Sequence, residues 1–223
     1  MSPRPRTRKQ RVIGDDEFLQ LLGGVLPEMA QAAARILERA GAYTVLCPAC
    51  GGGKVGTYLA RKGFRVTAYD SSSQTVTRAA AVARQCGVQV EMFVDDVVVP
   101  RRSLRRFDAL YAGDLLSHLL ASQRHTLLRS CYRALRQGGV LVVSVMSVDD
   151  ERYGYGRMVE PDTFEFGTGE SIHFYAAHDL HAELSRHFVV THIQDIVETQ
   201  EVPGLGQQTY RMLLAAAQKL DPD

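Results

Sequence analysis

The sequence predicts an α/β protein built on a doubly wound, mainly parallel β-sheet with helices on both faces. Three features lead to this prediction. Residues 44–70 read as a strand, a glycine-rich turn, a helix and a second strand that ends on Asp70. Apolar runs and amphipathic helical stretches then alternate along the chain as far as residue 147. Near the C-terminus, two strand-like stretches lie so close in sequence that antiparallel pairing is expected.

The composition is that of an ordinary globular domain. Of the 223 residues 45% are hydrophobic, so one sizeable core is expected. A net charge of +1 indicates neither a dedicated nucleic-acid binder nor a protein for strongly acidic partners. Four cysteines, without a signal-peptide pattern or a long apolar run, predict a soluble cytoplasmic protein with no membrane partner.

The chain is expected to be a basic tail followed by one domain. Residues 1–11 are rich in arginine and lack an apolar pattern, which predicts a disordered tail. Such a tail could attract RNA, but the lack of interleaved aromatic residues favours a plain solvated terminus. Residues 12–223 contain no internal repeat and no domain-sized linker, and are therefore expected to fold as a single domain.

Strands and helices follow from the spacing of apolar residues. The expected strands are residues 44–47, 64–70, 88–96, 107–113, 139–147, 188–198 and 209–217. The expected helices are residues 15–40 in two pieces broken near Pro27, 54–62, 71–86, 123–136 and 177–187. Residues 148–172 are polar and glycine-rich, so an irregular segment is expected there, and residues 148–175 are interpreted as a substrate-side insertion or lid.

The glycine turn after the first strand is typical of nucleotide binding. Its glycines allow a ligand to approach the backbone, and the N-terminus of the next helix favours groups rich in hydrogen-bond acceptors. Asp70 ends the second strand, where a carboxylate can accept hydrogen bonds from ribose hydroxyls.

A dinucleotide is one reading of this turn, because Gly51, Gly53 and Gly56 satisfy G-x-G-x-x-G. A short-chain dehydrogenase would also need Tyr-x-x-x-Lys after its fourth strand. The spacing occurs only at Tyr58 and Lys62, in the first βαβ helix. An NAD(P)-dependent oxidoreductase therefore remains a minor alternative.

The same residues resemble the class I S-adenosylmethionine-dependent methyltransferases, from about Arg35 to the C-terminus. Five family motifs match, in order, the stretches VLCPACGGG, TAYDSS, FVDD, FDALYAGDLLSHL and LRQGGVLVVSV. The region YGYGRMVEPDTFEFGTGESIHF resembles the tellurite-resistance subgroup, and a proline before the first motif's cysteine resembles thiol methyltransferases. The resemblance implies a single Rossmann-like domain with a seven-stranded sheet whose last strand is antiparallel. It also implies S-adenosyl-L-methionine as cofactor and S-adenosyl-L-homocysteine as product.

The resemblance assigns the cofactor site to the ends of the strands. Asp70 should hold the ribose and Asp96 should face the adenine amino group, whereas Asp95 is expected to face solvent. The expected cofactor-binding residues are Cys47, Cys50, Gly51, Gly53, Asp70, Ser71, Asp96, Val97 and Ala112.

The first motif departs from the family pattern at two positions. Cys47 stands where the family usually has an aspartate, and Ala49 stands where it usually has a glycine. Cys47 and Cys50 also form a C-x-x-C, a spacing used in redox and metal sites. Since Cys86 and Cys131 lie on apolar helical faces, a second pair at metal spacing is lacking, and no metal site is expected.

Candidate catalytic residues follow the fourth strand. His118 is a candidate general base because an imidazole titrates near neutral pH, although a packed histidine would fit as well. Asp114 could orient the acceptor, contact the cofactor or cap the next helix. His173 is expected to close over the acceptor. The expected substrate-contacting residues are Tyr153, Tyr155 and Tyr175.

The predicted activity is methyl transfer to an O, N or S atom of a small molecule, mainly by proximity and alignment. Two alternatives stay open: an RNA methyltransferase steered by the basic tail, and a non-catalytic nucleotide-binding or scaffolding subunit. Either a monomer or a homodimer is compatible with the sequence.

Overall fold

The computed structural model describes residues 13–22, 28–102, 104, 106–167, 169–202, 204 and 206–220. The predicted basic tail, residues 1–11, and the predicted helix break at residues 23–27 lie outside the described residues.

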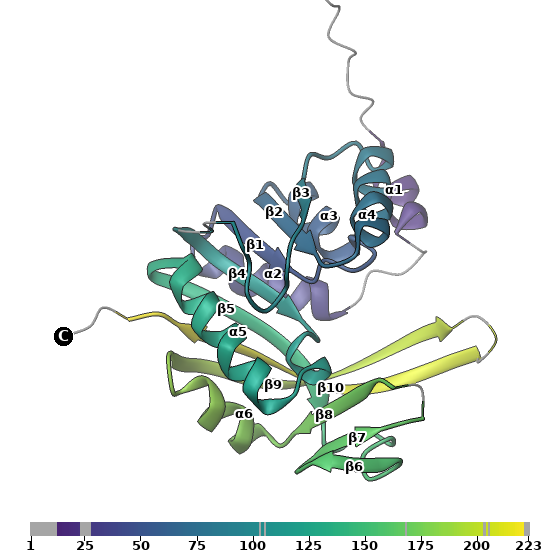
Figure 1. Ribbon diagram of the computed structural model, residues 1–223. Coiled ribbons are helices and arrows are strands. Elements are labelled where there is room, and N and C mark those ends of the chain that lie inside the picture. The colour runs from purple at the N-terminus through teal and green to yellow at the C-terminus, as the bar shows by residue number, and fades with distance from the viewer. Residues whose placement is uncertain are drawn as a thin grey trace, which may run out of the picture.

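Seven strands make the central sheet, in the spatial order β3-β2-β1-β4-β5-β10-β9 (Figure 1). They are β1 (Thr44–Pro48), β2 (Arg65–Asp70), β3 (Glu91–Val94), β4 (Phe107–Gly113), β5 (Leu135–Ser147), β9 (Val189–Val202) and β10 (Gly206–Gln218). β10 runs antiparallel to both of its neighbours, while β1 to β5 pair in parallel. The predicted fold class is therefore confirmed, including the antiparallel last strand.

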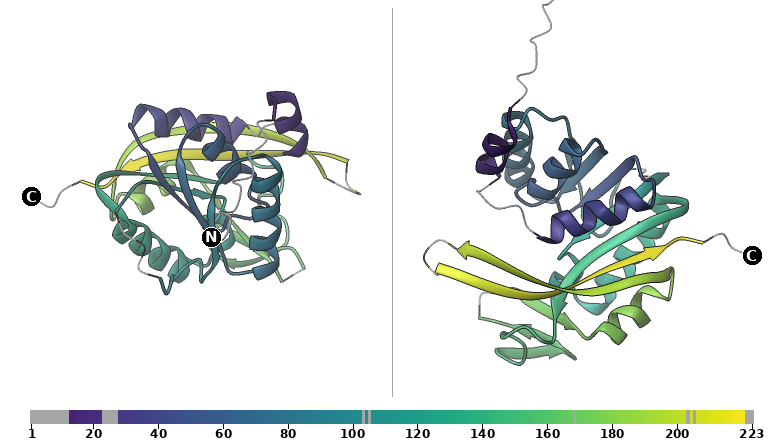
Figure 2. Two further views of the ribbon diagram at one scale, coloured as in Figure 1. Left: turned by 90° about the horizontal axis from the view of Figure 1, so that it is seen from above. Right: turned by 180° about the vertical axis from the view of Figure 1, so that it is seen from behind.

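Helices pack against the sheet in two layers (Figure 2). The helices are α1 (Asp15–Leu21), α2 (Glu28–Arg39), α3 (Lys54–Arg61), α4 (Ser73–Gln85), α5 (Ala121–Ala134) and α6 (Ala177–Leu184). Apolar residues of α1, α2 and α3 form one core with the sheet, and those of α5 and α6 form the other core. The alternation of strand side chains, as with Val45 and Leu46, supplies both cores and explains the continuous apolar runs in the sequence.

The connection between β3 and β4 is organised by Asp95. Its carboxylate accepts backbone N–H bonds from Asp96, Arg101 and Arg102 at 2.9, 3.0 and 3.1 Å. Burial alone would raise its pKa, but these donors outweigh burial and lower it. Asp95 is only 8% exposed, so the expectation that it faces solvent was wrong: its carboxylate stabilises the turn.

The segment expected to be irregular contains three short strands. β6 (Arg157–Glu160), β7 (Thr163–Glu165) and β8 (Ser171–Tyr175) form an antiparallel meander. β8 also pairs in parallel with the end of β5, where Met146 opposes Phe174. The strands were missed because each is too short to show a period of two, and because their pairing is set by packing on Met146, Phe164 and Phe174.

β9 and β10 form a long hairpin that projects beyond the sheet (Figures 1 and 2). β10 pairs with β5 only from Met212 onward, whereas its pairing with β9 begins at Gly206. In the described part of the chain, none of the helices is long and apolar enough to cross a membrane.

Candidate functional site

The glycine turn after β1 is wound through left-handed backbone conformations. The φ angles are 51° at Ala49, 50° at Gly51 and 76° at Gly53. Gly53 N donates to the carbonyl of Cys50 at 2.9 Å, which closes the turn where α3 begins. A Cβ on Gly53 would lie 2.7 Å from the Ala79 Cβ, so this position requires glycine for packing against α4.

Asp70 ties the end of β2 to this turn. Its Oδ2 accepts a hydrogen bond from Gly51 N at 3.2 Å, and its Oδ1 accepts one from Ser72 N at 3.0 Å. Ser71, between the two contacts, is exposed. The carboxylate thus stands beside the backbone that the sequence assigned to a nucleotide.

The remaining residues expected to bind the cofactor lie at the ends of β3 and β4. Asp96 is exposed, and its Oδ1 accepts N–H bonds from Val98 and Val99 at 2.8 and 2.7 Å. Val97 is half-buried against the core beneath α5. Ala112 is fully packed within that core, so only its backbone could reach a ligand.

A cavity of about 660 Å³ opens beside the glycine turn. Five of the residues expected to bind or react line it: Cys47, Cys50, Gly51, Asp114 and His118. Further lining residues, which the sequence did not single out, come from α2, α3, β4, β5, the segment after β5, β9 and β10. They include Met29, Lys54, Tyr111, Ser144, Met146, Arg152, Glu170, Ile172, Glu198, Tyr210 and Met212.

Asp114 and His118 face each other in this cavity. His118 Nε2 lies 3.3 Å from Asp114 Oδ2, and this hydrogen bond raises the pKa of His118 although partial burial opposes the rise. Asp114 has a φ of 52°, and its N–H is bonded to Ser144 O at 2.9 Å and Ser144 Oγ at 3.0 Å. Its Oδ1 is buried and has no hydrogen-bond partner among the described groups, so it can accept a bond from a ligand.

Arg152 is fixed on another wall of the cavity. Its Nε and Nη2 donate to the carboxylate of the buried Asp150 at 2.7 and 3.1 Å, and its guanidinium lies 4.5 Å from the Tyr210 ring centroid. Asp150 also accepts the Arg211 N–H of β10 at 2.8 Å. This clamp joins the segment after β5 to the hairpin and holds a cation at the cavity wall.

The cavity thiols are protonated at neutral pH. Burial raises the pKa of Cys47 to about 12, and burial together with the Asp70 charge raises that of Cys50 to about 11. Both cysteines are free. In the described part of the chain, no three His, Cys, Asp or Glu side chains are grouped as a metal site would need. The two thiols therefore act as small neutral walls of the cavity.

The structure corrects the expectations for His173 and Tyr175. His173 is 8% exposed and bonds Thr163 Oγ1 through Nδ1 at 2.8 Å, and burial lowers its pKa. Tyr175 is completely buried and donates to Glu183 Oε2 at 3.0 Å. Neither lines the cavity, because side chains alternate along β8 and Ile172 takes the cavity side instead.

The two remaining tyrosines are also outside the cavity lining. The Tyr153 hydroxyl donates to Asp162 Oδ1 at 2.6 Å, and its ring packs edge-on against Phe164 and Phe174. Tyr155 is 67% exposed. The tyrosines that do line the cavity are Tyr111 and Tyr210.

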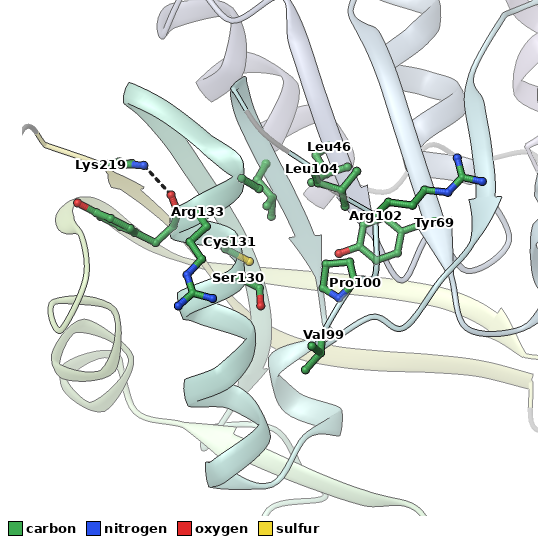
Figure 3. A pocket seen from close by; sticks show the side chains of 13 residues that line it. Leu46, Tyr69, Val99, Pro100, Arg102, Leu104, Ser130, Cys131, Arg133 and Lys219 are labelled. Carbon is green, nitrogen blue, oxygen red and sulfur yellow. Dashed lines mark hydrogen bonds between the residues drawn. The ribbon is translucent and has the colours of Figure 1, made fainter.

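A second cavity, of about 590 Å³, lies between α5 and the sheet (Figure 3). Its walls include Leu46, Tyr69 and Cys131, and at its edge Lys219 Nζ donates to the Tyr132 carbonyl at 2.7 Å. None of the residues expected to bind or react lines this cavity. The candidate site is therefore the cavity at the glycine turn.

Part of this chain matches a known protein family. A family described as "Methyltransferase domain" matches residues 45–139, which contain the glycine turn, Asp70, Asp114 and His118. A ubiquinone biosynthesis O-methyltransferase of Xanthomonas axonopodis pv. citri is 34% identical over 112 residues, which are 50% of this chain and 46% of that protein. The chain spans about half the length of the curated relatives it matches.

Solved structures resemble the chain over most of its length. A SAM-dependent methyltransferase from Methanosarcina mazei has a TM-score of 0.71 at 20% identity, over 84% of this chain and 98% of that one. A 1,6-didemethyltoxoflavin-N1-methyltransferase from Burkholderia thailandensis, solved with bound S-adenosylhomocysteine, has a TM-score of 0.67 at 23% identity, over 86% and 79%. Residues 45–139 thus match a methyltransferase-domain family, and the chain shares the class I fold of S-adenosylmethionine-dependent methyltransferases of known structure.

Proposed function

We propose that this protein transfers a methyl group from S-adenosylmethionine to an O, N or S atom of a small molecule. The observation that carries the proposal is the cavity that runs from the glycine turn at Gly51 to the Asp114–His118 pair. A turn of the kind that binds nucleotides and a proton-accepting pair then line the same cavity. The relative named as an O-methyltransferase favours oxygen as the acceptor atom.

The residues at the turn fit this cofactor. A Cβ placed on Gly51 or Gly52 would meet nothing within 4 Å, so there is open space beside these backbones. In this proposal Asp70 holds the ribose, with Ser71 adjacent, and Asp96 together with Val97 holds the adenine. The unpartnered Asp114 Oδ1 offers a further acceptor at the other end of the cavity.

When bound, S-adenosylmethionine supplies an already activated methyl group. The protein's own task is then to align the acceptor and to exclude water. Met29, Met146 and Met212 line the cavity with apolar surface, which serves the second purpose. For an acceptor that is protonated at working pH, His118 is placed to accept the proton while Asp114 stabilises the resulting imidazolium.

The segment at residues 148–175 is proposed to form the acceptor side of the site. This segment contributes Arg152, Glu170 and Ile172 to the lining of the cavity, which the glycine turn also lines. Substitutions in a loop-rich segment such as this one can change which acceptor is bound without disturbing the sheet.

Calorimetric titration tests the proposal. The purified protein should bind S-adenosylmethionine and S-adenosylhomocysteine, and Asp70→Ala should abolish binding, whereas Asp195→Ala, at an exposed position on β9, should not. Binding of NAD(H) alone would refute the methyltransferase proposal and support an oxidoreductase. If none of these nucleotides binds, the turn is structural only.

A further inference from the structure

Glu198 is a buried carboxylate in the wall of the candidate site. It lies on β9, is 6% exposed, and lines the cavity together with Met29 and Cys47. Its direct partner across the hairpin is Tyr210, which lines the same cavity. The hairpin thus brings an acidic group to the cavity that the glycine turn lines, from more than a hundred residues away in sequence.

Only part of this carboxylate is used by the fold. Its Oε1 accepts the backbone N–H of Met29 in the first turn of α2. That contact is a helix-capping interaction, favoured by the helix dipole. A carboxylate can accept about four hydrogen bonds, and among the described residues Glu198 accepts this one N–H, which uses only part of that capacity.

The charge of Glu198 has no basic partner in the described part of the chain, where none of the ion pairs includes it. Lys54 lines the same cavity but forms no ion pair with it among those described residues. Buried carboxylates are costly unless a cation or several donors compensate them. A cationic group of a ligand would supply the compensation.

The surroundings of Tyr111 locate this charge within the cavity. Burial raises the pKa of the Tyr111 hydroxyl, a hydrogen bond with Ser144 opposes the rise, and the charges of Asp114 and Glu198 add to it. Tyr111 and both carboxylates line the same cavity, as does Cys47.

We infer that Glu198 binds the ammonium group of the amino-acid part of the cofactor. The assignment rests on the function proposed above, because S-adenosylmethionine carries a primary ammonium group attached to the nucleoside through sulfur. A buried, cavity-facing carboxylate with spare acceptor capacity matches a primary ammonium with its three donors.

Two ligands separate this role from a purely structural one. S-adenosylhomocysteine carries the amino-acid part, and 5′-methylthioadenosine has the same nucleoside and sulfur without it. Glu198→Gln keeps an oxygen for the Met29 N–H and removes the charge. We expect it to weaken S-adenosylhomocysteine binding about tenfold or more while leaving methylthioadenosine binding and the melting temperature unchanged. Asp195→Asn, an exposed charge on the same strand, should change neither affinity.

Other results would overturn the assignment. Equal losses for both ligands would mean that Glu198 acts through the fold, and an unchanged affinity for S-adenosylhomocysteine would mean that it does not touch the cofactor. Should Glu198→Gln fold poorly, Glu198→Asp keeps the charge on a shorter side chain and should still weaken only S-adenosylhomocysteine. Failure of both ligands to bind the unaltered protein would instead refute the proposed cofactor.

Discussion

His118 Nε2 lies 3.3 Å from Asp114 Oδ2, so an imidazole and a carboxylate share one wall of the cavity. Asp114 holds this position in a left-handed conformation that few residues other than glycine adopt. Two bonds to Ser144 fix its N–H, and its second carboxylate oxygen is buried without a partner among the described groups. Strained, incompletely bonded residues of this kind concentrate at functional sites.

The first prediction concerns pH. Because the bond to Asp114 raises the pKa of His118, activity on a protonated acceptor should fall as pH drops through that raised pKa, where the base becomes protonated. Asp114→Asn removes the raising charge, so the acidic limb of the kcat profile should move to lower pH. His118→Ala should lower kcat about 100-fold. His178→Ala, an exposed histidine beside Asp179, is the control. If the acidic limb of the kcat profile stayed at the same pH in Asp114→Asn, His118 paired with Asp114 would not be the base.

Features formed by residues close together in the sequence could be predicted, whereas features formed by distant residues could not. The strand, turn and helix around Gly51 and Asp70 are encoded within one short stretch, and their arrangement was predicted correctly. The site beyond them depends on distant pairings, such as Glu198 opposite Tyr210 in the hairpin.

The direction of side chains on short strands could also not be predicted from the sequence. His173 and Tyr175 were assigned to the acceptor because they follow a polar segment. Their side depends on the alternation along β8, and Ile172 rather than either of them faces the cavity. Cys47, by contrast, lines the cavity as predicted. Its position could be predicted because β1 and the turn are formed by neighbouring residues in the sequence.

The second prediction concerns Ala49, whose φ of 51° is unfavourable for a residue with a Cβ. Ala49→Gly should relieve this strain and stabilise the protein by ~0.5–1 kcal/mol, after the greater freedom of glycine in the unfolded chain is subtracted. Ala80→Gly, within α4, should instead destabilise by a similar ~0.5–1 kcal/mol. Urea unfolding measures both. Loss of stability in Ala49→Gly would show that the turn is not strained there.

The third prediction concerns the buried network on the α5–α6 side of the sheet. Arg124 is 6% exposed, and its Nε donates to Glu183 Oε1 at 3.2 Å, while Tyr175 donates to Oε2 of the same carboxylate. Glu183→Gln leaves the buried guanidinium without this charge and should cost about 3 kcal/mol in urea unfolding. Asp15→Asn, which removes the exposed carboxylate that pairs with Arg61, should have little effect. Cofactor affinity should be unchanged in both variants. If a folded Glu183→Gln variant lost cofactor affinity, Tyr175, which donates to Glu183, would have to be assigned to the cofactor site after all.

The fourth prediction separates two adjacent glycines. Gly53 has a φ of 76°, and a Cβ there would lie 2.7 Å from the Ala79 Cβ and 2.9 Å from its Cα, so Gly53→Ala must displace α4. It should lower the free energy of unfolding by about 2 kcal/mol or more. Gly52 has open space around its Cβ position and lines the cavity. Gly52→Ala should therefore leave the melting temperature nearly unchanged and yet weaken S-adenosylhomocysteine binding, because the added methyl enters the space proposed for the cofactor. Thermal unfolding and calorimetry on both variants make the comparison, and full affinity in Gly52→Ala would place the cofactor away from this backbone.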